Sequence, residues 1–434
     1  MKHLTIFLLF VFLLSACTPV ATAVPTIAPQ STLPTATFTP EPIATQTASP
    51  TETLIPAPTQ MGGGKGKLIF DYFSREYNKN FPEVAGESNI FIASPDGSGL
   101  TPITNMAGYN FLKDVSPDGT KVLFVSIDDW NATTADLYSV DIASNSQPIK
   151  LATGLPYSYN FYESARWLDN LKLVYVGQGD KELGIYIINA DGTNPINIEN
   201  GNNPVEILGV GQESVFWKTN KNTSHVISPA WWTNLDGSKT GKLTYNGRQI
   251  NSYNLHENDI ALSPDGTRLA WVDAGTPESG HTENWLQIAD INDIDHPFIS
   301  LELITSGSDL KWRRDGKSLI VFDEGSVNWG FGKGSDNYGY FEMSAESGTV
   351  IKNYQLSDEI MGAGDDFTPL QCGDISPDDK FLPCFVFASD KDKTAEGFLP
   401  AQLIFLNLET GIMTRTTDIV FYFGGLSRKI TWIP

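Results

Sequence analysis

His256 and His281 are the residues of this chain best suited to acid–base or metal chemistry. Each has a carboxylate close by in the sequence, Glu257 for the first and Glu283 for the second. Imidazole titrates near neutral pH and binds metals, so such pairs can act as general bases or as ligands. Solvated loop histidines fit the same pattern, and that alternative stays open. We assign no catalytic residue, cofactor or metal site, because no Gly-x-Ser-x-Gly elbow, HExxH motif or phosphate-binding glycine loop is present.

A second pair with chemical potential is Cys372 and Cys384. These cysteines bracket the turn 376–380 almost symmetrically about Asp378. In a hairpin they would therefore lie nearly opposite each other, within bridging distance. We predict a disulfide, with two buried thiols as the alternative. Two cysteines without a nearby histidine lack the ligand set of a metal site.

The third cysteine, Cys17, ends an export signal. Lys2 and His3 precede an apolar run, 6–14, that is too short to cross a bilayer as a mature helix. The run ends in Leu14-Ser15-Ala16-Cys17, which resembles the lipobox of bacterial lipoproteins. The resemblance implies that 1–16 is a signal peptide and that Cys17 is acylated, for example with palmitate. An ordinary cleaved signal with a chance cysteine is the alternative.

These features predict a protein of the bacterial cell envelope, anchored by its lipid and facing the extracytoplasmic side. The following segment, 17–64, is dominated by Thr, Pro and Ala and has no periodic apolar face. Such a composition cannot offset the entropy of folding, so we predict a disordered, partly extended linker. The chain of 434 residues has a formal net charge of −22. That charge disfavours nucleic acid as a partner.

From Lys65 onward the chain repeats with a period of about fifty residues. Each copy has the pattern strand, tight turn, strand, with Pro, Asp and Gly placed as a type I turn with a bulge requires. A third strand, a second turn and a fourth strand follow. The clearest copies are Ser116-Pro117-Asp118-Gly119 and Ser263-Pro264-Asp265-Gly266, with degenerate ones at 312–320 and 375–381.

These copies resemble the TolB-type, WD-like propeller repeat, and the resemblance covers 65–434. We therefore expect an all-β β-propeller with four antiparallel strands per blade. Segment 430–434 matches an opening strand, which the first repeat lacks, so we expect a blade shared between the two ends of the chain. Counting gives seven blades, and six stay possible because the fourth repeat is poorly marked: 67–104, 111–153, 163–201, 205–246, 259–305, 309–357 and 372–418.

The loop lengths predict two different faces. The turns between first and second and between third and fourth strands are short, whereas the other connections are long. Long connections open on one face of a propeller, here called the loop-rich face, and the short turns lie on the opposite tight-turn face. Aromatic and histidine side chains on the loop-rich face suit stacking on sugars or anchoring a protein. The candidate ligand-binding residues are Trp130, Tyr159, Tyr162, His256, His281, Trp285, Trp329 and Tyr338.

From this pattern we predict a non-enzymatic, monomeric lipoprotein that binds a protein or glycan through the loop-rich face. One alternative is a glycan-active enzyme, a lyase or hydrolase, with its active site in the central funnel of that face. The TolB-like resemblance implies a third role, as a scaffold in envelope assembly.

Overall fold

A computed structural model describes the chain over the ranges 66–73, 87–129, 131–143, 146–156, 164–178, 183–219, 228–252, 260–274, 284–303, 309–323, 339–355, 371–387, 399–423 and 429–433. All of them belong to one compact unit, Pro58–Pro434. The predicted signal peptide, Cys17 and the linker 17–64 lie outside the described residues. The described part consists of strands and turns without a helix. It accordingly holds no helix long and apolar enough to span a membrane.

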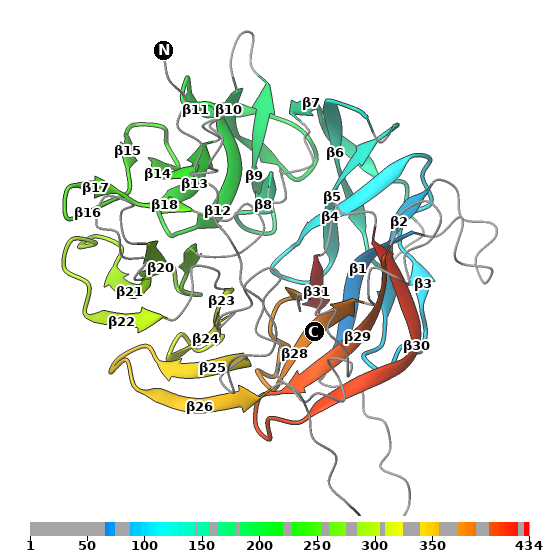
Figure 1. Cartoon of the computed structure of the whole chain (residues 1–434). Coiled ribbons are helices and arrows are strands. Elements are labelled where there is room, and N and C mark those ends of the chain that lie inside the picture. Colours follow the sequence, from blue (N-terminus) through cyan, green and yellow to red (C-terminus); the bar gives the residue numbers. More distant parts are fainter. Residues whose placement is uncertain are drawn as a thin grey trace, which may run out of the picture. The chain divides into compact units, whose positions relative to one another are not determined.

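The strands form successive antiparallel sheets, and the fold is a β-propeller (Figure 1). The first two sheets are β31(Ile430–Ile433)-β1(Lys67–Phe73)-β2(Ser88–Ala93)-β3(Thr101–Pro102) and β4(Tyr109–Val115)-β5(Lys121–Ile127)-β6(Thr134–Asp141)-β7(Ile149–Pro156). They are linked by a parallel pairing of Ser88 with Tyr109. The next two are β8(Ala165–Trp167)-β9(Lys172–Gln178)-β10(Leu183–Asn189)-β11(Ile196–Asn200) and β12(Pro204–Val210)-β13(Ser214–Thr219)-β14(Ser228–Asn234)-β15(Thr240–Lys242).

Three further sheets complete the described fold. They are β19(Ile260–Leu262)-β20(Arg268–Ala274)-β21(Asn284–Asp290)-β22(Ile299–Leu303), β23(Leu310–Trp312)-β24(Ser318–Asp323)-β25(Gly339–Ser344)-β26(Val350–Gln355) and β27(Gln371–Cys372)-β28(Phe381–Phe387)-β29(Leu399–Asn407)-β30(Met413–Phe423). A small hairpin, β16(Thr244–Tyr245)-β17(Arg248–Gln249), and β18(Asn251–Ser252), which pairs with β14, follow β15. The first strands of neighbouring sheets contact each other, as β4 does β8 and β12 does β19.

The predicted closure by both chain ends is confirmed. Strand β31 pairs antiparallel with β1, with Trp432 opposite Leu68 and Ile430 opposite Phe70. All four residues of β31 are buried. The carboxyl-terminal strand therefore supplies the innermost strand of the sheet that begins the domain. The pairing covers the inner edge of β1, and β31 becomes the innermost edge strand of that sheet.

The tight turns form because their side chains satisfy the backbone locally. In the turn after β4, Asp118 Oδ1 accepts hydrogen bonds from the backbone nitrogen of Thr120 at 3.0 Å and from Ser116 Oγ at 2.7 Å. Gly119 takes a positive φ of 71°, a conformation that a side chain disfavours. The turn after β19 repeats this arrangement with Ser263, Asp265 and Gly266. The Ser-Pro-Asp-Gly motif thus closes the first hairpins of the β4–β7 and β19–β22 sheets.

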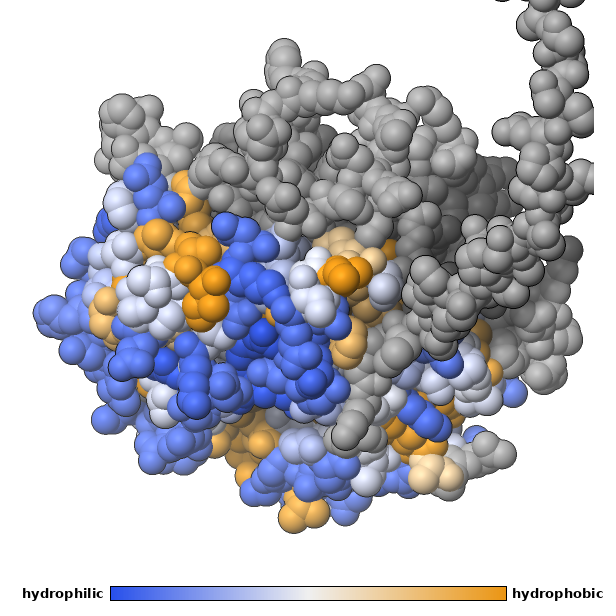
Figure 2. Space-filling view, turned by 90° about the horizontal axis from the view of Figure 1, so that it is seen from below, coloured by the Kyte–Doolittle hydropathy of each residue, from blue (hydrophilic) through white to orange (hydrophobic). Residues whose placement is uncertain are grey.

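The core lies between neighbouring sheets. Because side chains alternate along a strand, β5 sends Leu123 and Val125 to one side and Val122 and Phe124 to the other. Leu123 packs in a cluster that includes Trp167 of β8, whereas Phe124 packs in one that includes Ile90 of β2. Each sheet is therefore buried on both faces. In the side view of Figure 2, the described outer surface is mainly hydrophilic, with hydrophobic residues interspersed.

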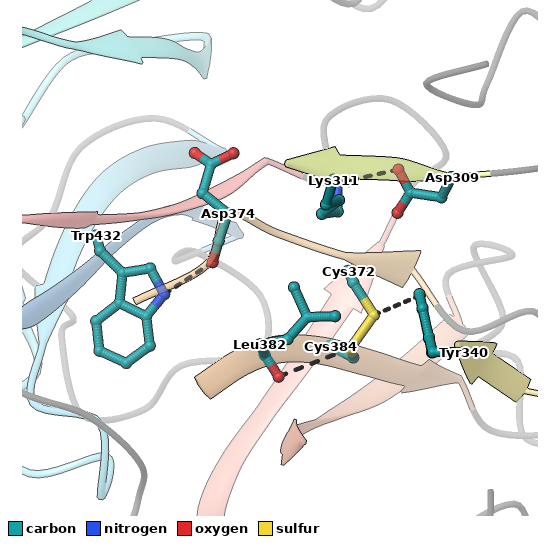
Figure 3. Close-up of a disulfide and its surroundings, with 8 residues drawn as sticks. All are labelled: Asp309, Lys311, Tyr340, Cys372, Asp374, Leu382, Cys384 and Trp432. Carbon is teal, nitrogen blue, oxygen red and sulfur yellow. Dashed lines mark hydrogen bonds and ion pairs between the residues drawn. A yellow bond between two sulfur atoms is a disulfide. The ribbon is translucent and has the colours of Figure 1, made fainter. Parts of the chain in front are cut away.

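A disulfide joins Cys372 of β27 to Cys384 of β28, which are directly opposite in the strand register (Figure 3). Both cysteines are buried. Tyr340 of β25 donates a hydrogen bond from its hydroxyl to Cys372 Sγ at 2.7 Å. The cross-link therefore holds the short strand β27 on its sheet and faces the neighbouring one.

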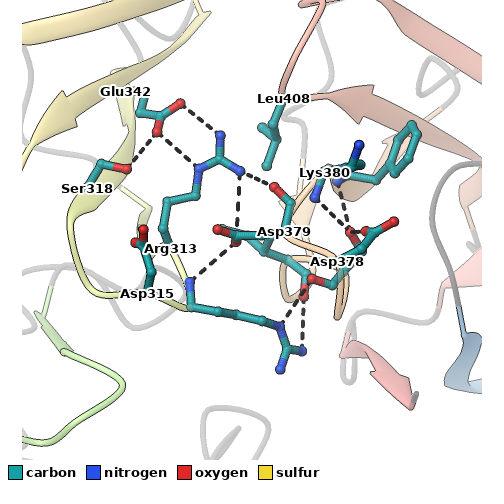
Figure 4. Close-up of polar contacts among 12 residues, drawn as sticks. Arg313, Asp315, Ser318, Glu342, Asp378, Asp379, Lys380 and Leu408 are labelled. Carbon is teal, nitrogen blue, oxygen red and sulfur yellow. Dashed lines mark hydrogen bonds and ion pairs between the residues drawn. The ribbon is translucent and has the colours of Figure 1, made fainter.

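On the tight-turn face, contacts between neighbouring turns fasten the sheets to one another. Arg313 forms a bidentate pair with Glu342, with both distances at 3.0 Å, and donates to the backbone oxygen of Asp379 in the next sheet (Figure 4). Arg314 donates to the backbone oxygen of Ser376 at 3.1 Å. Similar contacts link the turns at 118 and 170 and at 212 and 265. Hydrogen bonds between turns therefore hold neighbouring sheets together on this face.

Candidate functional site

Of the predicted ligand-binding residues, the structure describes Trp285. The other seven lie outside the described residues: Trp130, Tyr159, Tyr162, His256, His281, Trp329 and Tyr338. The described part of the chain contains no group of three or more His, Cys, Asp or Glu residues that could hold a metal ion.

Trp285 lies in the second residue of β21, at the loop-rich end of its sheet. Segment 275–283, which joins β20 to β21, leaves and returns at this end. Trp285 is half-buried and sits directly opposite Asp273 of β20. An indole beside a carboxylate combines a flat apolar surface with a strong hydrogen-bond acceptor, which suits a sugar or a protein side chain.

Asp273 is held by a short insertion of the preceding sheet. Arg248 of β17 approaches its carboxylate at 3.2 Å. Burial raises the pKa of Asp273, although the charge and hydrogen bond of Arg248 oppose that rise. Tyr245 of β16 packs edge-on against Trp271, with ring centroids 5.5 Å apart. The β16–β17 hairpin thus spans from the β12–β15 sheet to the β19–β22 sheet.

Polar side chains continue from Asp273 into the space between these two sheets, here called the seam and defined by Glu206, Lys218, Trp271 and Gln287. Leu269 and Ala289 pack with Phe216 and Ala230 of the neighbouring sheet. Since side chains two residues apart share a face, Trp271 and Gln287 also face that neighbour. Both are buried, with 0% and 3% of their surface exposed.

On the side of the seam opposite Trp271 and Gln287, Lys218 of β13 pairs with Glu206 of β12 in the same sheet at 2.9 Å. Their side chains are only 2% and 10% exposed. Lys218 lies three residues beyond the second-strand member of the residue pair nearest the first tight turn. The same position in three other second strands carries an apolar residue: Val125, Val176 and Val272. A buried ion pair contributes little net stability, so its presence at an otherwise apolar level favours a role other than packing.

A second polar group lies where the innermost strands converge, and we call it the axial cluster: Arg166, Lys311, Asp374, Lys429 and Thr431. Lys311 pairs with Asp309 at 3.0 Å (Figure 3). Arg166 donates from Nε to the backbone oxygen of Ile207 in the next sheet at 3.2 Å. Cluster members from three other sheets influence one carboxyl group, that of Asp374.

The environment of Asp374 favours its charged form. The surrounding protein opposes ionisation and is the largest single effect, but the charges of Lys429 and Lys311 outweigh it together with smaller contributions. These are a hydrogen bond from Thr431 and the charge of Arg166. The net result is a pKa of Asp374 below its usual value, while the residue remains exposed to solvent. Asp374 is thus exposed beside cationic residues where the innermost strands converge.

Sequence reasoning missed both the seam and the axial cluster. The axial residues could have been found by aligning the repeats on their tight turns. Arg166, Lys311, Asp374 and Thr431 each directly precede an apolar residue that aligns with Val115, the last residue before the first tight turn. The seam carries a weaker signal, because Lys218 and Gln287 are unusual only when strand register shows which residues of other sheets occupy the same level.

No family model and no curated protein matches the chain. Among solved structures, TolB from Acinetobacter baumannii is similar, with 13% identity, a TM-score of 0.38 and coverage of 65% of this chain and 62% of that one. An oligogalacturonate lyase from Vibrio parahaemolyticus has 13% identity over 69% and 80% of the chains, with a TM-score of 0.42. A functionally unknown protein from Desulfotomaculum acetoxidans has 12% identity over 85% and 98%, with a TM-score of 0.48. The chain spans less than two thirds of the Acinetobacter TolB.

Proposed function

We propose that this chain is a lipid-anchored, extracytoplasmic binding protein. In this proposal Cys17 carries the lipid, 17–64 is the linker, and the domain 65–434 has seven blades, one for each group of four strands. The propeller takes a protein or glycan ligand through its loop-rich face. The location rests on the apolar run 6–14 and the lipobox-like residues that follow it.

The observation that carries this proposal is the half-buried Trp285 beside Asp273 at the loop-rich end of β21 and β20. Aromatic rings with part of their surface exposed are typical anchors in binding sites. The opposite end of the same sheets is occupied by contacts between turns, such as that of Gln212 with the backbone oxygen of Asp265 at 3.3 Å. The two ends therefore differ in what they leave open to a ligand.

The test is binding of the domain to glycan arrays and to envelope extracts, comparing Trp285→Ala with Phe298→Ala. Phe298 is a matched control, since it is a 50% exposed aromatic before β22, at the tight-turn end of the sheet. We expect Trp285→Ala to weaken binding about tenfold or more, as loss of an aromatic anchor does. Phe298→Ala should bind like the parent. The reverse pattern would exclude the loop-rich face, and capture of envelope-assembly proteins alone would favour the scaffold role.

The axial cluster favours a second candidate, a glycan-active enzyme with its site in the central funnel. A lowered pKa makes the Asp374 carboxylate a weak base, so in this candidate it orients a substrate by accepting hydrogen bonds from sugar hydroxyls while the flanking cations hold acidic groups. The experiment is turnover of polysaccharides by the parent and by Asp374→Asn. Turnover that is lost in this variant would establish the enzyme, whereas binding without turnover in the parent supports the first proposal.

A further inference from the structure

Two buried polar atoms on opposed residues of the seam have no hydrogen-bond partner. They are Nε1 of Trp271, a donor, and Oε1 of Gln287, an acceptor. Trp271 and Gln287 are directly opposite in the register of β20 and β21. Buried polar groups are nearly always hydrogen-bonded, so a complementary donor and acceptor at one place call for an explanation.

Packing gives no reason for an amide at position 287. Trp271, which Gln287 opposes, is the fourth residue of β20, the second strand of its sheet. In the other sheets, the third-strand residue opposite the fourth residue of the second strand is aromatic or isoleucine. The six are Phe91, Tyr138, Tyr186, Trp231, Phe341 and Ile404. An apolar side chain therefore fits this level of a sheet, and burying an unsatisfied amide there is unfavourable.

The pair is also placed for access from the loop-rich face. Asp273 and Trp285 form the next pair on the same side of the same two strands, one step closer to that face. Exposure rises along this path, from buried Gln287 to the Asp273 side chain, which is 26% exposed. A ligand resting on Trp285 and Asp273 thus has polar atoms directly beneath it.

We propose that Trp271 and Gln287 form a binding site for a single hydroxyl group. The hydroxyl oxygen accepts the hydrogen bond of Trp271 Nε1, and its hydrogen is donated to Gln287 Oε1. One hydroxyl satisfies both atoms, which no apolar group can do. The hydroxyl comes either from an ordered water molecule or from a sugar that enters past Trp285. The sugar source rests on the proposed function; the water source does not.

A double-mutant cycle of Gln287→Leu and Trp271→Phe tests the site through the folding equilibrium in urea. If one hydroxyl bridges both residues, Gln287→Leu lowers the folding equilibrium constant by about tenfold, and the double variant loses clearly less than the product of the two single effects. Tyr186→Leu with Tyr175→Phe, the opposed pair of β10 and β9, provides the control for packing alone. Two outcomes would overturn the proposal. One is that the single effects on the folding equilibrium constant simply multiply in the double variant, and the other is that Gln287→Leu is more stable than the parent.

Thermal melts with glucose, galactose and mannose distinguish the two sources. A rise in melting temperature that is present in the parent and absent in Gln287→Leu identifies a sugar hydroxyl. Coupling without such a rise, with electron density about 3 Å from both atoms in a crystal, identifies water. Failure of the proposed function, seen as unchanged ligand binding in Trp285→Ala, leaves the water result intact and is therefore distinguishable.

Discussion

Trp432 Nε1 donates a hydrogen bond of 2.9 Å to the backbone oxygen of Asp374, 58 residues earlier in the sequence. The backbone nitrogen of Asp374 in turn donates to the backbone oxygen of Ile430 at 3.2 Å. These two bonds fasten the carboxyl-terminal strand to the start of the β27–β30 sheet. The innermost strand of one sheet is thereby fixed on both sides, to β1 within its own sheet and to Asp374 in the next.

Removal of Ile430–Pro434 should therefore destabilise the whole domain, because β1 loses its neighbour and Leu68 and Phe70 lose their packing against Trp432. Each large side chain exposed costs about 1.5–3 kcal/mol. Urea unfolding followed by tryptophan fluorescence measures the loss. Trp432→Phe is the milder variant and should cost about 1–2 kcal/mol. A truncated domain that unfolds like the parent would contradict the closure.

The disulfide predicts a single mass for the non-reduced domain with no alkylatable thiol. Cys372 and Cys384 are 12 residues apart, and a loop of this size makes the cross-link worth about 2–4 kcal/mol. The double variant Cys372→Ser with Cys384→Ser should be less stable by that amount in urea. Its melting should be insensitive to reductant, whereas that of the parent should fall when reductant is added. Two alkylated cysteines in the parent would exclude the bond.

Arg313→Met should be strongly destabilising, since it leaves Glu342 charged and largely enclosed. Burial acts to raise the pKa of Glu342, but hydrogen bonds from Arg313, Ser318 and Tyr354 outweigh it and lower that pKa. Removing one partner of such a pair costs about 3–5 kcal/mol. Adding Glu342→Gln should recover part of the loss. Lys317→Met is the control, because the Lys317 side chain is 84% exposed and should contribute less than about 0.5 kcal/mol.

The tight turns predict a loss of stability in acid. Hydrogen bonds from Ser263 and from the backbone of Thr267 lower the pKa of Asp265 from 3.8 to about 2. Because the folded-state pKa lies below the unfolded one, the carboxylate stabilises the fold above pH 3.8. That contribution is lost as the pH falls from 3.8 to about 2. The urea midpoint of the parent should drop across this window.

Asp265→Asn should reduce the steepness of that drop, since one titrating group has been removed. The other turn aspartates, including Asp118 and Asp236, have pKa values lowered for the same reason. They should therefore preserve part of the acid-induced drop in the urea midpoint of the variant. An identical pH dependence in the variant and the parent would show that Asp265 does not contribute.

The sequence predicts the repeated hairpins because their determinants are local. Ser263, Asp265 and Gly266 make their own turn, so the motif alone establishes which strands pair. The closure by both chain ends can also be predicted from the sequence, because 430–433 has the pattern of an opening strand, which the first repeat lacks. The two-residue strands β16 to β18 were not predicted, because strands so short have no periodicity to recognise.

The sites depend on what the ring brings together. Nothing near Lys311 or Asp374 in the sequence shows that Arg166 lies close, since all three meet only where separate sheets converge. The role of Gln287 is equally hidden in the sequence, because its chain neighbours are those of an ordinary strand residue. Only the pairing of β20 with β21 shows that the unpaired indole nitrogen of Trp271 belongs to the residue opposite it.

The position of β1 between β31 and β2 has a mechanical consequence. Lys67 is the first residue of β1, so a pull along the chain from its amino-terminal side enters the domain there. Hydrogen-bonded ladders on both sides of β1 share that force along their length. A force along β1 is thus resisted in shear by two ladders at once, which must break together before the strand is released.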